Sequence, residues 1–526
     1  MNVFFNRSAV SLLSAGVFLS AAVSINLFVS ARPVQSAAAT YSDLGLSEQV
    51  QIDAYIQTRM RMANIPGLAL GVVRGDQIVY LKGYGLAGPD GRAVTPQTPF
   101  IIGSLSKSFT ALAVMQLVEA GRIDLDAPVT TYLPWFRTAD PAASAEITVR
   151  HLLNQDSGLP VYDGRRGLVD DDQGDAALET GVRQLATVTL SHPAGQAFEY
   201  ANENYTTLGL IVQAVSGSSY EDVIRTRTFA PLQMRHSAAA MSDPAAQDIA
   251  TGYRYWLLWP FAFDAPYPRG QTPAGFLISS AEDMSHYLIA QLNGGTYDGQ
   301  QVLSPDGMAT LHAPGARMGA TSSYAMGWVV RDQAGALRLE HNGDVSNFHA
   351  NMLLLPDQKV GIVILMNVDG FNHGASLNVP IEGVAAILQG QGLSPEVDPP
   401  MNWLPPTLLL LPLLIGVLWL AGSFAFIRRW QRRGELPVRG WPILWRYALP
   451  LTVDFGLGVA AWIILPTRFQ TPMATIGLFA PDVFAILVLL TVLGLASALG
   501  RSLHVLRRTR QIHATGHGTG SSPVLA

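Results

Sequence analysis

The 526-residue sequence predicts an α+β fold, in which an antiparallel sheet is flanked by helices and interrupted by an inserted helical subdomain. Two observations predict it. Two apolar runs, 67–73 and 77–83, flank a turn near the start of the globular segment, and a second pair, 350–355 and 360–366, lies near its far end. The segment between the two pairs is rich in helical patterns. We therefore expect one sheet closed by strands from both ends, followed by a helical membrane module.

The composition narrows the class of protein. Only 14% of the residues are charged and the mean hydropathy is +0.23, which is too apolar for an ordinary soluble enzyme. The net charge is −5, and basic residues gather only beside apolar segments, so nucleic-acid binding is not expected. Cysteine is absent, which excludes disulfides, thiol catalysis and cysteine-ligated metals. No metal and no cofactor are expected.

The chain divides into three predicted parts, 1–39, 40–395 and 396–526. The first part contains an apolar, uncharged run at 9–29 and small residues at 36–39, as in a signal peptide with its cleavage site. The run is also long enough to remain as an N-terminal anchor. Either alternative places the globular domain, 40–395, outside the cytoplasmic membrane.

The last part predicts three transmembrane helices, at about 404–427, 447–466 and 481–499. Arginines gather between the first and second spans and after the third, so this loop and the C-terminal tail should be cytoplasmic. Asp454 lies within the second span and Asp482 near the outer end of the third. An acid inside a membrane suggests a functional site, with a structural role as the alternative. The expected location is the cell membrane, as a multi-pass protein.

A serine and a lysine stand together in the apolar stretch 100–120, which reads as a short strand followed by a helix. Ser104 lies at the turn and Lys107 one helical turn later on the same face. Backbone N–H groups at a helix start favour negative charge, and burial allows a lysine to lose its proton. The chain has only two other lysines, Lys82 and Lys359. The alternative is a helix-capping serine with a solvated lysine.

Two further motifs lie far along the chain. Tyr200 and Asn202 precede an apolar helix, and in an extended segment both side chains would point to one side. The phenol could exchange protons and the amide could bind a substrate carbonyl; a buried tyrosine with a capping asparagine is the alternative. A strand ending at His341 would present the imidazole at its tip, and Gly343 would let a ligand approach the backbone. Read alone, that motif is a turn.

Two other stretches have more than one interpretation. The aromatic and proline-rich run 253–267 could wall an apolar cleft, lie against the bilayer, or pack in the core. His151 starts a short predicted helix, where a bond to the local backbone is the preferred reading over a catalytic role.

Together, S-L-S-K from Ser104, Y-A-N from Tyr200 and H-N-G from His341 resemble the motifs of the penicillin-recognising serine hydrolases. The chain is similar to the branch with Tyr-x-Asn, which holds class C beta-lactamases, D-alanyl-D-alanine carboxypeptidases, D-aminopeptidases and related esterases. The stretch Y-A-M-G-W from Tyr324 also matches, and the resemblance covers about 47–391. It implies the beta-lactamase/transpeptidase-like fold for this segment.

The resemblance also implies roles for the site residues. Ser104 would be the acylated nucleophile, with Lys107 as its neighbour in proton transfer. Tyr200 would act as the general base or proton relay, and Asn202 would hold the substrate amide. The backbone N–H groups of Ser104 and Asp344 would form the oxyanion hole.

Three departures from the family pattern affect substrate choice. His341 stands where the beta-lactamases of this branch have lysine, so a carboxylate-binding ammonium is replaced by a ring that is only partly charged near neutral pH. Asp344 places an acid beside the expected oxyanion hole. Phe276 stands where relatives often carry a second glycine and is expected to narrow the site. With histidine in place of lysine at position 341, the chain resembles the esterase and peptidase relatives more than the beta-lactamases.

The sequence therefore predicts an exported, membrane-tethered serine hydrolase that forms an acyl-enzyme with a small-molecule or peptide ester or amide. One candidate substrate is a cell-wall peptide ending in D-alanine. The alternatives are an esterase or beta-lactamase acting on small molecules, and a catalytically silent ligand-binding or cell-envelope partner protein that keeps this fold.

Overall fold

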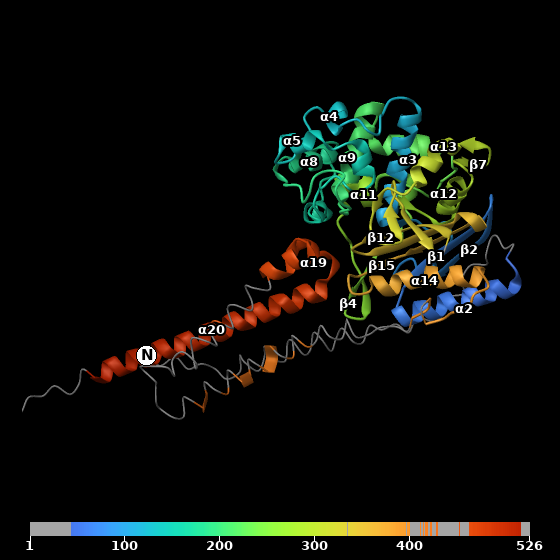
Figure 1. Cartoon of the computed structure of the whole chain (residues 1–526). Helices are drawn as coiled ribbons and strands as arrows, with labels where there is room; N and C mark the ends of the chain where they lie inside the picture. Colours follow the sequence, from blue (N-terminus) through green and yellow to red (C-terminus); the bar gives the residue numbers. More distant parts are fainter. Residues whose placement is uncertain are drawn as a thin grey trace, which may run out of the picture.

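An antiparallel sheet of eight strands forms the centre of the computed structural model (Figure 1). The strand order is β2-β1-β14-β13-β12-β11-β10-β9. Strands β1 and β14 pair with Leu68 opposite Met366 and Arg74 opposite Val360, so the prediction of one sheet closed by hairpins from both ends is confirmed. The strands are β1 (Gly67–Arg74), β2 (Gln77–Gly85), β9 (Ala316–Arg317), β10 (Ser322–Tyr324), β11 (Val329–Gln333), β12 (Ala336–Val345), β13 (Phe348–Leu355) and β14 (Val360–Met366).

The structure describes the globular part almost completely and the C-terminal segment 396–526 in part. The described residues are 44–333, 335–395, 397–399, scattered positions between 411 and 452, and 462–516. The predicted signal segment 1–39 and Asp454 lie outside the described residues, as do most of the predicted spans 404–427 and 447–466.

Two helices, α2 (Leu46–Ala63) and α14 (Gly374–Leu388), cover one face of the sheet (Figure 1). They pack closely, because a Cβ atom on Gly383 of α14 would lie 2.1 Å from the ring of Tyr55 in α2. Every residue of β1 except Arg74 is buried. A strand covered on both faces needs a continuous apolar sequence, which explains the unbroken run that predicted β1.

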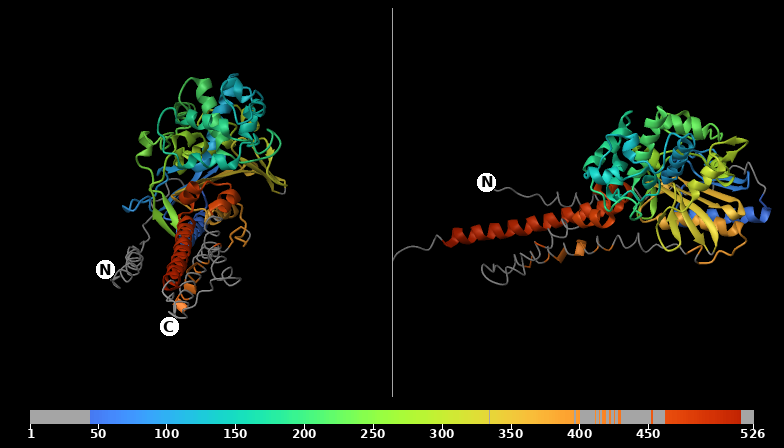
Figure 2. Two further views of the ribbon diagram at one scale, coloured as in Figure 1. Left: turned by 90° about the vertical axis from the view of Figure 1, so that its left-hand side faces the viewer. Right: turned by 45° about the horizontal axis from the view of Figure 1, so that its top comes forward.

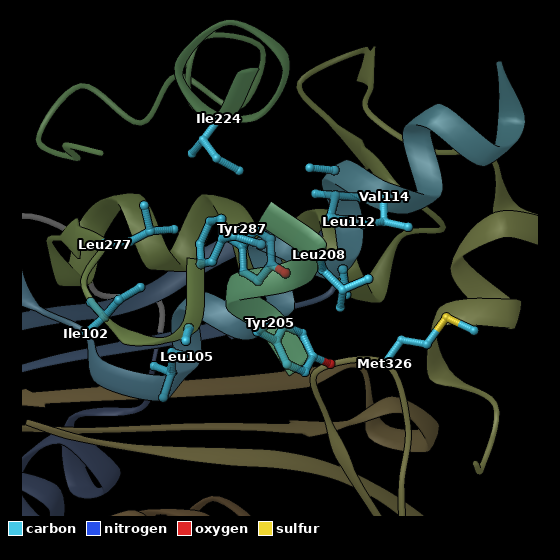
Figure 3. Close-up of a cluster of buried hydrophobic side chains, with 14 of the residues drawn as sticks. Ile102, Leu105, Leu112, Val114, Tyr205, Leu208, Ile224, Leu277, Tyr287 and Met326 are labelled. Atoms are coloured by element: carbon cyan, nitrogen blue, oxygen red, sulfur yellow. The ribbon is translucent and has the colours of Figure 1, made fainter. Parts of the chain in front are cut away.

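A helical region covers the opposite face. Its elements enclose a large apolar core, part of which is drawn in Figure 3. The residues of this region come from the middle of the chain, as the sequence predicted. The longer helices are α3 (Ser106–Glu119), α8 (Ala177–Gln184), α9 (Asn202–Ser216), α12 (Ala281–Leu292) and α13 (Pro305–His312); the shorter ones are α4 (Val129–Tyr132), α5 (Pro141–Ala145), α6 (Val149–Leu153), α7 (Val161–Gly164), α10 (Tyr220–Ile224) and α11 (Thr272–Gly275).

Helix α3 lies inside this core rather than on the surface. It follows the two-residue strand β3 (Phe100–Ile101) and the 3₁₀ turn η1 (Gly103–Leu105), so the predicted strand-turn-helix at 100–120 is confirmed. Its Leu112 side chain packs among residues from several other helices (Figure 3). A helix that is apolar on every side is normally buried. The first turn of α3 is therefore held rigidly at the edge of the sheet.

Strand β12 passes alongside η1 and continues further than the sequence indicated. The expected strand that ends in 341–343 is present and extends two residues further, because β12 pairs with β13 beyond His341, with Gly343 opposite Ala350 and Val345 opposite Phe348. The strand β11 stops pairing with β12 at Glu340. The free edge of β12 from His341 onward is thus available to approach η1.

The aromatic run 253–267 forms a hairpin of β4 (Tyr253–Trp256) and β5 (Trp259–Ala262), which joins β15 (Val368–Asp369) in a small sheet. Trp256 is 44% exposed and Trp259 46% exposed. The tip of the hairpin is therefore not core packing. Two further pairs of short strands complete the fold: β3 with β6 (Ile278–Ser279), and β7 (Thr296–Tyr297) with β8 (Gln300–Gln301).

The described C-terminal segment consists of residues 462–469, which are helical, the short helix α19 (Met473–Phe479) and the long helix α20 (Pro481–Gly516). Helix α20 projects away from the globular part (Figures 1 and 2). Among the described residues, one helix, Pro481–Gly500, is long and apolar enough to cross a membrane, with a mean hydropathy of 2.5. It coincides with the third span predicted from the sequence.

Candidate active site

The turn η1 brings Ser104 against strand β12. Gly103 adopts a left-handed conformation, with φ at +55°, and a Cβ atom there would lie 2.6 Å from the backbone nitrogen of Asp344. A Cβ atom on Gly343 would lie 2.2 Å from the carbonyl oxygen of Ile102 and 2.9 Å from the backbone nitrogen of Ser104. Glycine at both positions thus permits a backbone contact that any side chain would prevent. The two segments that carry the Ser104 and Asp344 amides meet here.

Lys107 is fully buried and its amine makes three polar contacts. The Nζ atom lies 3.0 Å from Ser104 Oγ, 2.9 Å from Asn202 Oδ1 and 2.6 Å from the carbonyl oxygen of Ala274. Two of these partners are pure acceptors and the third is a hydroxyl. A neutral amine can donate its two N–H groups to the two carbonyl oxygens and turn its lone pair to the Ser104 hydroxyl.

Burial lowers the pKa of Lys107 to about 7, although the carboxylates of Glu203 and Asp344 oppose the shift. Removing an ammonium from water destabilises its charged form, and the nearby carboxylates only partly compensate. Lys107 is therefore close to half neutral at physiological pH. The alternative of a solvated lysine is excluded by its burial.

Tyr200 and Asn202 meet Lys107 from the segment that enters α9. The Lys107 Nζ atom lies 4.7 Å from the centre of the Tyr200 ring. Burial raises the pKa of Tyr200 well above its ordinary value, and a hydrogen bond with Ser104 offsets this only in part. Asn202 Nδ2 donates to the carbonyl of Gly164 at 3.1 Å, while its oxygen accepts from Lys107. The alternative of a capping asparagine is not observed, because Ala201 is the N-cap of α9.

His341 faces the same site but carries no charge. Its Nδ1 lies 2.6 Å from the carbonyl oxygen of Asn342 and its Nε2 lies 3.1 Å from the Tyr324 hydroxyl. Since a carbonyl can only accept, Nδ1 is protonated and Nε2 accepts from Tyr324. Burial and then the charge of Lys107 lower the pKa of His341 to about 4. The ring is thus neutral at neutral pH, rather than partly charged as the sequence suggested.

Asp344 belongs to a cluster beneath the site. Its Oδ1 lies 2.7 Å from Nδ1 of the buried His349, and its Oδ2 accepts from Asn342 at 2.6 Å. Burial alone would raise the pKa of Asp344, but His349 and Asn342 outweigh it and lower the pKa. The pKa of His349 is raised, because Asp344 outweighs its burial. The two side chains form an ion pair.

A metal could in principle bind where this ion pair meets Asp369. One atom each of Asp344, His349 and Asp369 lie within 4.8 Å of one another, the only such group among the described residues. Burial and the neighbouring Asp344 raise the pKa of Asp369 well above its usual range. The imidazole also lies 3.1 Å from Asn378 Oδ1 through Nε2. Asn351 Nδ2 lies 2.8 Å from the same Nε2, so both ring nitrogens of His349 have protein partners, which is typical of a hydrogen-bonded cluster.

A cavity of about 770 Å³ opens over these groups. Its lining includes five of the predicted site residues, and Lys107 is hydrogen-bonded to two of them, Ser104 and Asn202. Gly343 contributes its backbone contact beneath the cavity rather than a side chain. The predicted residues that line it are Ser104, Tyr200, Asn202, His341 and Asp344.

Two expectations about neighbouring residues have clear outcomes. Phe276 does not line the cavity, because its ring packs edge-to-face on Tyr267 with centres 5.6 Å apart. The expected narrowing of the site by Phe276 is therefore wrong. His151 accepts a hydrogen bond from the Thr148 backbone in a helix capping box, which confirms the structural reading.

Sequence reasoning missed two charged residues near the site. Glu203 is buried directly behind Lys107, and burial raises its pKa to about 7. Its place next to Asn202 in the sequence could have suggested it. Arg165 lines the cavity and donates to the carbonyl oxygen of Phe469 at 2.7 Å and to the Thr471 hydroxyl. A contact between segments so distant in the chain leaves no local signal.

Comparison with known proteins places the chain in a family. A family model described as Beta-lactamase matches residues 52–385. Protein flp of Staphylococcus aureus (strain MW2) is 31% identical over 324 residues, which are 61% of this chain and 63% of that protein. Penicillin-binding protein 4 of Amycolatopsis lactamdurans is 28% identical over 318 residues, 58% of this chain and 81% of that protein. The chain thus spans less than two thirds of the staphylococcal relative's length.

Solved structures share the fold. The octameric penicillin-binding protein homologue from Pyrococcus abyssi is 26% identical, with a TM-score of 0.55 over 65% of this chain and 78% of that chain. D-amino acid amidase from Ochrobactrum anthropi SV3 is 21% identical, with a TM-score of 0.57 over 65% and 99%, and supports the fold alone. Since the family model matches more than half of the chain, the protein belongs to the beta-lactamase family of serine hydrolases.

Proposed function

We propose that the protein is an exported, membrane-tethered serine hydrolase that forms an acyl-enzyme at Ser104 with an ester or amide substrate. One observation carries this proposal. A fully buried lysine with a pKa of about 7 lies 3.0 Å from a serine hydroxyl at the floor of a large cavity. A base close to half neutral at working pH and within hydrogen-bond reach of a nucleophile is what acyl transfer requires.

The neutral amine of Lys107 takes the proton of Ser104 as Oγ bonds to the carbonyl carbon of the substrate. The negative charge on the carbonyl oxygen is stabilised by the backbone N–H groups of Ser104 and Asp344. The ammonium of Lys107 then protonates the departing alcohol or amine as the scissile bond breaks. Water attacks the acyl-serine ester, again losing its proton to Lys107, and the acid product leaves with Ser104 restored.

Tyr200 relays the proton from the Lys107 ammonium to the departing group in this scheme rather than acting as a free base. Its raised pKa keeps the phenol protonated at neutral pH. Asn202 holds Lys107 in place through its oxygen, and Nδ2 has a second N–H for a substrate carbonyl. The roles of proton transfer and positioning are thus divided between the two residues.

Substrate class follows from charge. His341 is neutral, His349 is paired with Asp344, and Arg165 donates to the segment around Phe469. The cavity therefore offers no unengaged cation, among its described lining residues, for a substrate carboxylate. This favours neutral esters and amides. A D-alanine-containing cell-wall peptide remains the specific candidate, supported by the similarity to a penicillin-binding protein.

The second candidate function is that of an esterase or beta-lactamase acting on small molecules. The same nucleophile, base and oxyanion donors would catalyse these reactions. A catalytically silent cell-envelope partner protein is disfavoured by the lowered pKa of Lys107 beside Ser104. For location, we propose a multi-pass membrane protein with domain 40–395 on the extracytoplasmic side and 396–526 as the membrane module. The apolar helix Pro481–Gly500 supports the tether.

Acylation should occur at Ser104 and nowhere else. When the full chain is treated with a small fluorophosphonate, digested and weighed, we expect one adduct, on the peptide that carries Ser104. Ser104→Ala should abolish it. Ser108→Ala is the matched control, because Ser108 lies one turn further along α3 and donates to the Leu105 carbonyl instead. A folded sample without an adduct on Ser104 would exclude the hydrolase.

The rate of acylation should rise with pH through about 7, because deprotonation of Lys107 supplies the base. At pH 6 the rate should be about tenfold below its plateau. Lys107→Arg keeps the charge but cannot lose it, so acylation should fall at least about 100-fold across the whole pH range.

Lys359→Arg is the control for this change, because Lys359 lies on an exposed turn far from the cavity. Glu203→Gln tests whether the rise of the acylation rate near pH 7 reports the titration of Lys107. The carboxylate of Glu203 favours the Lys107 ammonium, so its removal should lower the pKa of Lys107 and move this rise to lower pH. A pH profile of Lys107→Arg that matches the wild type would refute the assignment of Lys107.

Gly343→Ala should separate β12 from the Ser104 turn, because its Cβ atom would lie 2.2 Å from the Ile102 carbonyl oxygen. Loss of an oxyanion donor typically lowers the rate about 100-fold or more. We expect a loss of that size in acylation together with a lower melting temperature, because the new Cβ atom meets fixed backbone atoms. Gly392→Ala, where nothing lies within 4 Å, is the control. Equal acylation rates in the two variants would argue against this oxyanion hole.

A neutral substrate should react at least as fast as its carboxylate counterpart. We expect this from hydrolysis of a D-alanyl-D-alanine peptide compared with its carboxamide. Asp344→Asn removes the carboxylate that raises the pKa of the buried His349, so the imidazole should lose its charge together with Asp344 and the ratio should change less than about twofold. Asp357→Asn, on an exposed turn, should leave it unchanged. A wild-type preference for the carboxylate would contradict this charge argument.

A further inference from the structure

One wall of the catalytic cavity is built by the segment that leads into the membrane-spanning helix. Six apolar residues of the C-terminal segment line the same cavity as Ser104. Cavities of about 300 to 1,000 Å³ hold drug-sized ligands, and this one, at about 770 Å³, has room beyond a scissile bond. The six residues are Leu465, Phe469, Ile476, Phe479, Ala480 and Val483.

This wall is fixed to the hydrolase fold by specific contacts. Arg165 donates to the carbonyl of Phe469, and its own carbonyl accepts from the Thr475 hydroxyl at 2.8 Å. The backbone N–H of Phe371 donates to the Phe479 carbonyl at 3.2 Å. The rings of Phe371 and Phe469 also meet edge-to-face, with centres 5.7 Å apart. Two distant parts of the globular domain therefore hold the wall over the cavity.

The wall continues into the predicted span through α20. Val483 lines the cavity and is also the third residue of the apolar helix Pro481–Gly500. The hairpin β4–β5 is bonded to the start of this helix, since the Leu257 N–H donates to Asp482 Oδ2 at 3.1 Å. Its Trp256 and Trp259 are exposed beside that bond. Exposed tryptophans favour the membrane-water interface, so the cavity lies at the level where the helix enters the bilayer.

Asp482 thus has a structural role, because it joins the predicted span to the hairpin. Of the three alternatives for the run 253–267, the exposed tip of the hairpin favours a position against the bilayer. The hairpin is suited to the interface. The apolar wall lies between this interface and Ser104, which is the path that a substrate from the membrane surface would take.

We infer that the substrate is an ester or amide that carries an apolar chain of several carbons, and that this chain lies against α19 and the start of α20. The inference rests on the proposed hydrolase function. It adds the chemical class of the group next to the scissile bond. The chain could belong to a bilayer lipid or to a water-soluble amphiphile.

The test uses the full chain in lipid nanodiscs and two series of esters. One series is the acetyl, butyryl, octanoyl and decanoyl p-nitrophenyl esters; the other is the ethyl, butyl, octyl and decyl acetates. We expect kcat/KM in at least one series to rise roughly two- to fourfold per methylene until the cavity is filled. A flat or falling profile in both series, from a sample that forms the Ser104 adduct and cleaves the acetyl ester, would overturn the inference while leaving the hydrolase intact. A sample without adduct or cleavage would overturn both.

Charged substitutions in the wall separate chain binding from chemistry. Ile476→Asp and Phe479→Asp should lower the ratio of long-chain to acetyl activity at least about tenfold, because a carboxylate opposes an apolar chain. The acetyl rate and the fluorophosphonate adduct of each variant are measured alongside, so that the ratio separates chain binding from a general loss of activity. Ala474→Asp is the matched control, since Ala474 is exposed on the same helix and does not line the cavity. A ratio that falls equally in the control, or in none of the variants, would overturn the inference.

A final comparison distinguishes the two sources of the chain. The decanoyl ester is supplied either within the nanodisc bilayer or in solution below its critical micelle concentration. A higher rate from the bilayer assigns the substrate to the membrane, and a higher rate from solution assigns it to a soluble amphiphile. Both results support an apolar-chain substrate, whereas failure of the enzyme to cleave the decanoyl ester from either source would overturn it.

Discussion

The burial of one amine organises the catalytic part of this protein. Lys107 is enclosed by helices α3, α9 and α11, and its three polar contacts all come from groups with fixed positions. Burying the ammonium form of Lys107 costs free energy, and no carboxylate among the described residues contacts the amine to compensate for this cost. The neutral form of the amine is therefore accessible. The apolar core around α3 is therefore part of the chemistry, because it sets the proton affinity of the base.

Around this base, each ionisable group that could carry a positive charge is either uncharged or already bonded to another part of the protein. His341 is made neutral by burial and by the charge of Lys107, while His349 is paired with Asp344. Arg165 faces the C-terminal segment. The result is a catalytic site whose polarity is concentrated at the reacting atoms, bordered by an apolar wall. That distribution differs from a site built to capture a carboxylate, and it is consistent with the absence of a lysine at position 341.

Features determined by nearby residues could be predicted from the sequence, and those determined by distant ones could not. The hairpins around β1 and β14 follow from apolar runs and turns, and the pairing of Ser104 with Lys107 follows from helical spacing. The charge state of His341 depends on its burial and on the distant Lys107, neither of which the motif reveals. The path of β12 past His341 depends on its pairing with β13, so the sequence signal of a turn was misleading.

The membrane part shows the same division. The apolar helix at Pro481–Gly500 was evident from composition, but its contribution to the cavity depends on contacts between Arg165 and residues about 300 positions away. The role of Asp482 likewise depends on Leu257 from a separate hairpin. Composition identifies an apolar helix, whereas only the folded structure shows that the residues at its start line the cavity over Ser104.

The contact between Gly103 and Gly343 has a further consequence. Each glycine leaves room for the backbone of the other's segment, so a side chain at either position would open the same gap. Once the gap is open, a second side chain has little left to displace, and the two substitutions should be strongly non-additive. The two positions are 240 residues apart in the sequence, yet their effects on stability should be coupled. Once one glycine has been replaced, the close backbone contact that requires glycine at the other position is lost.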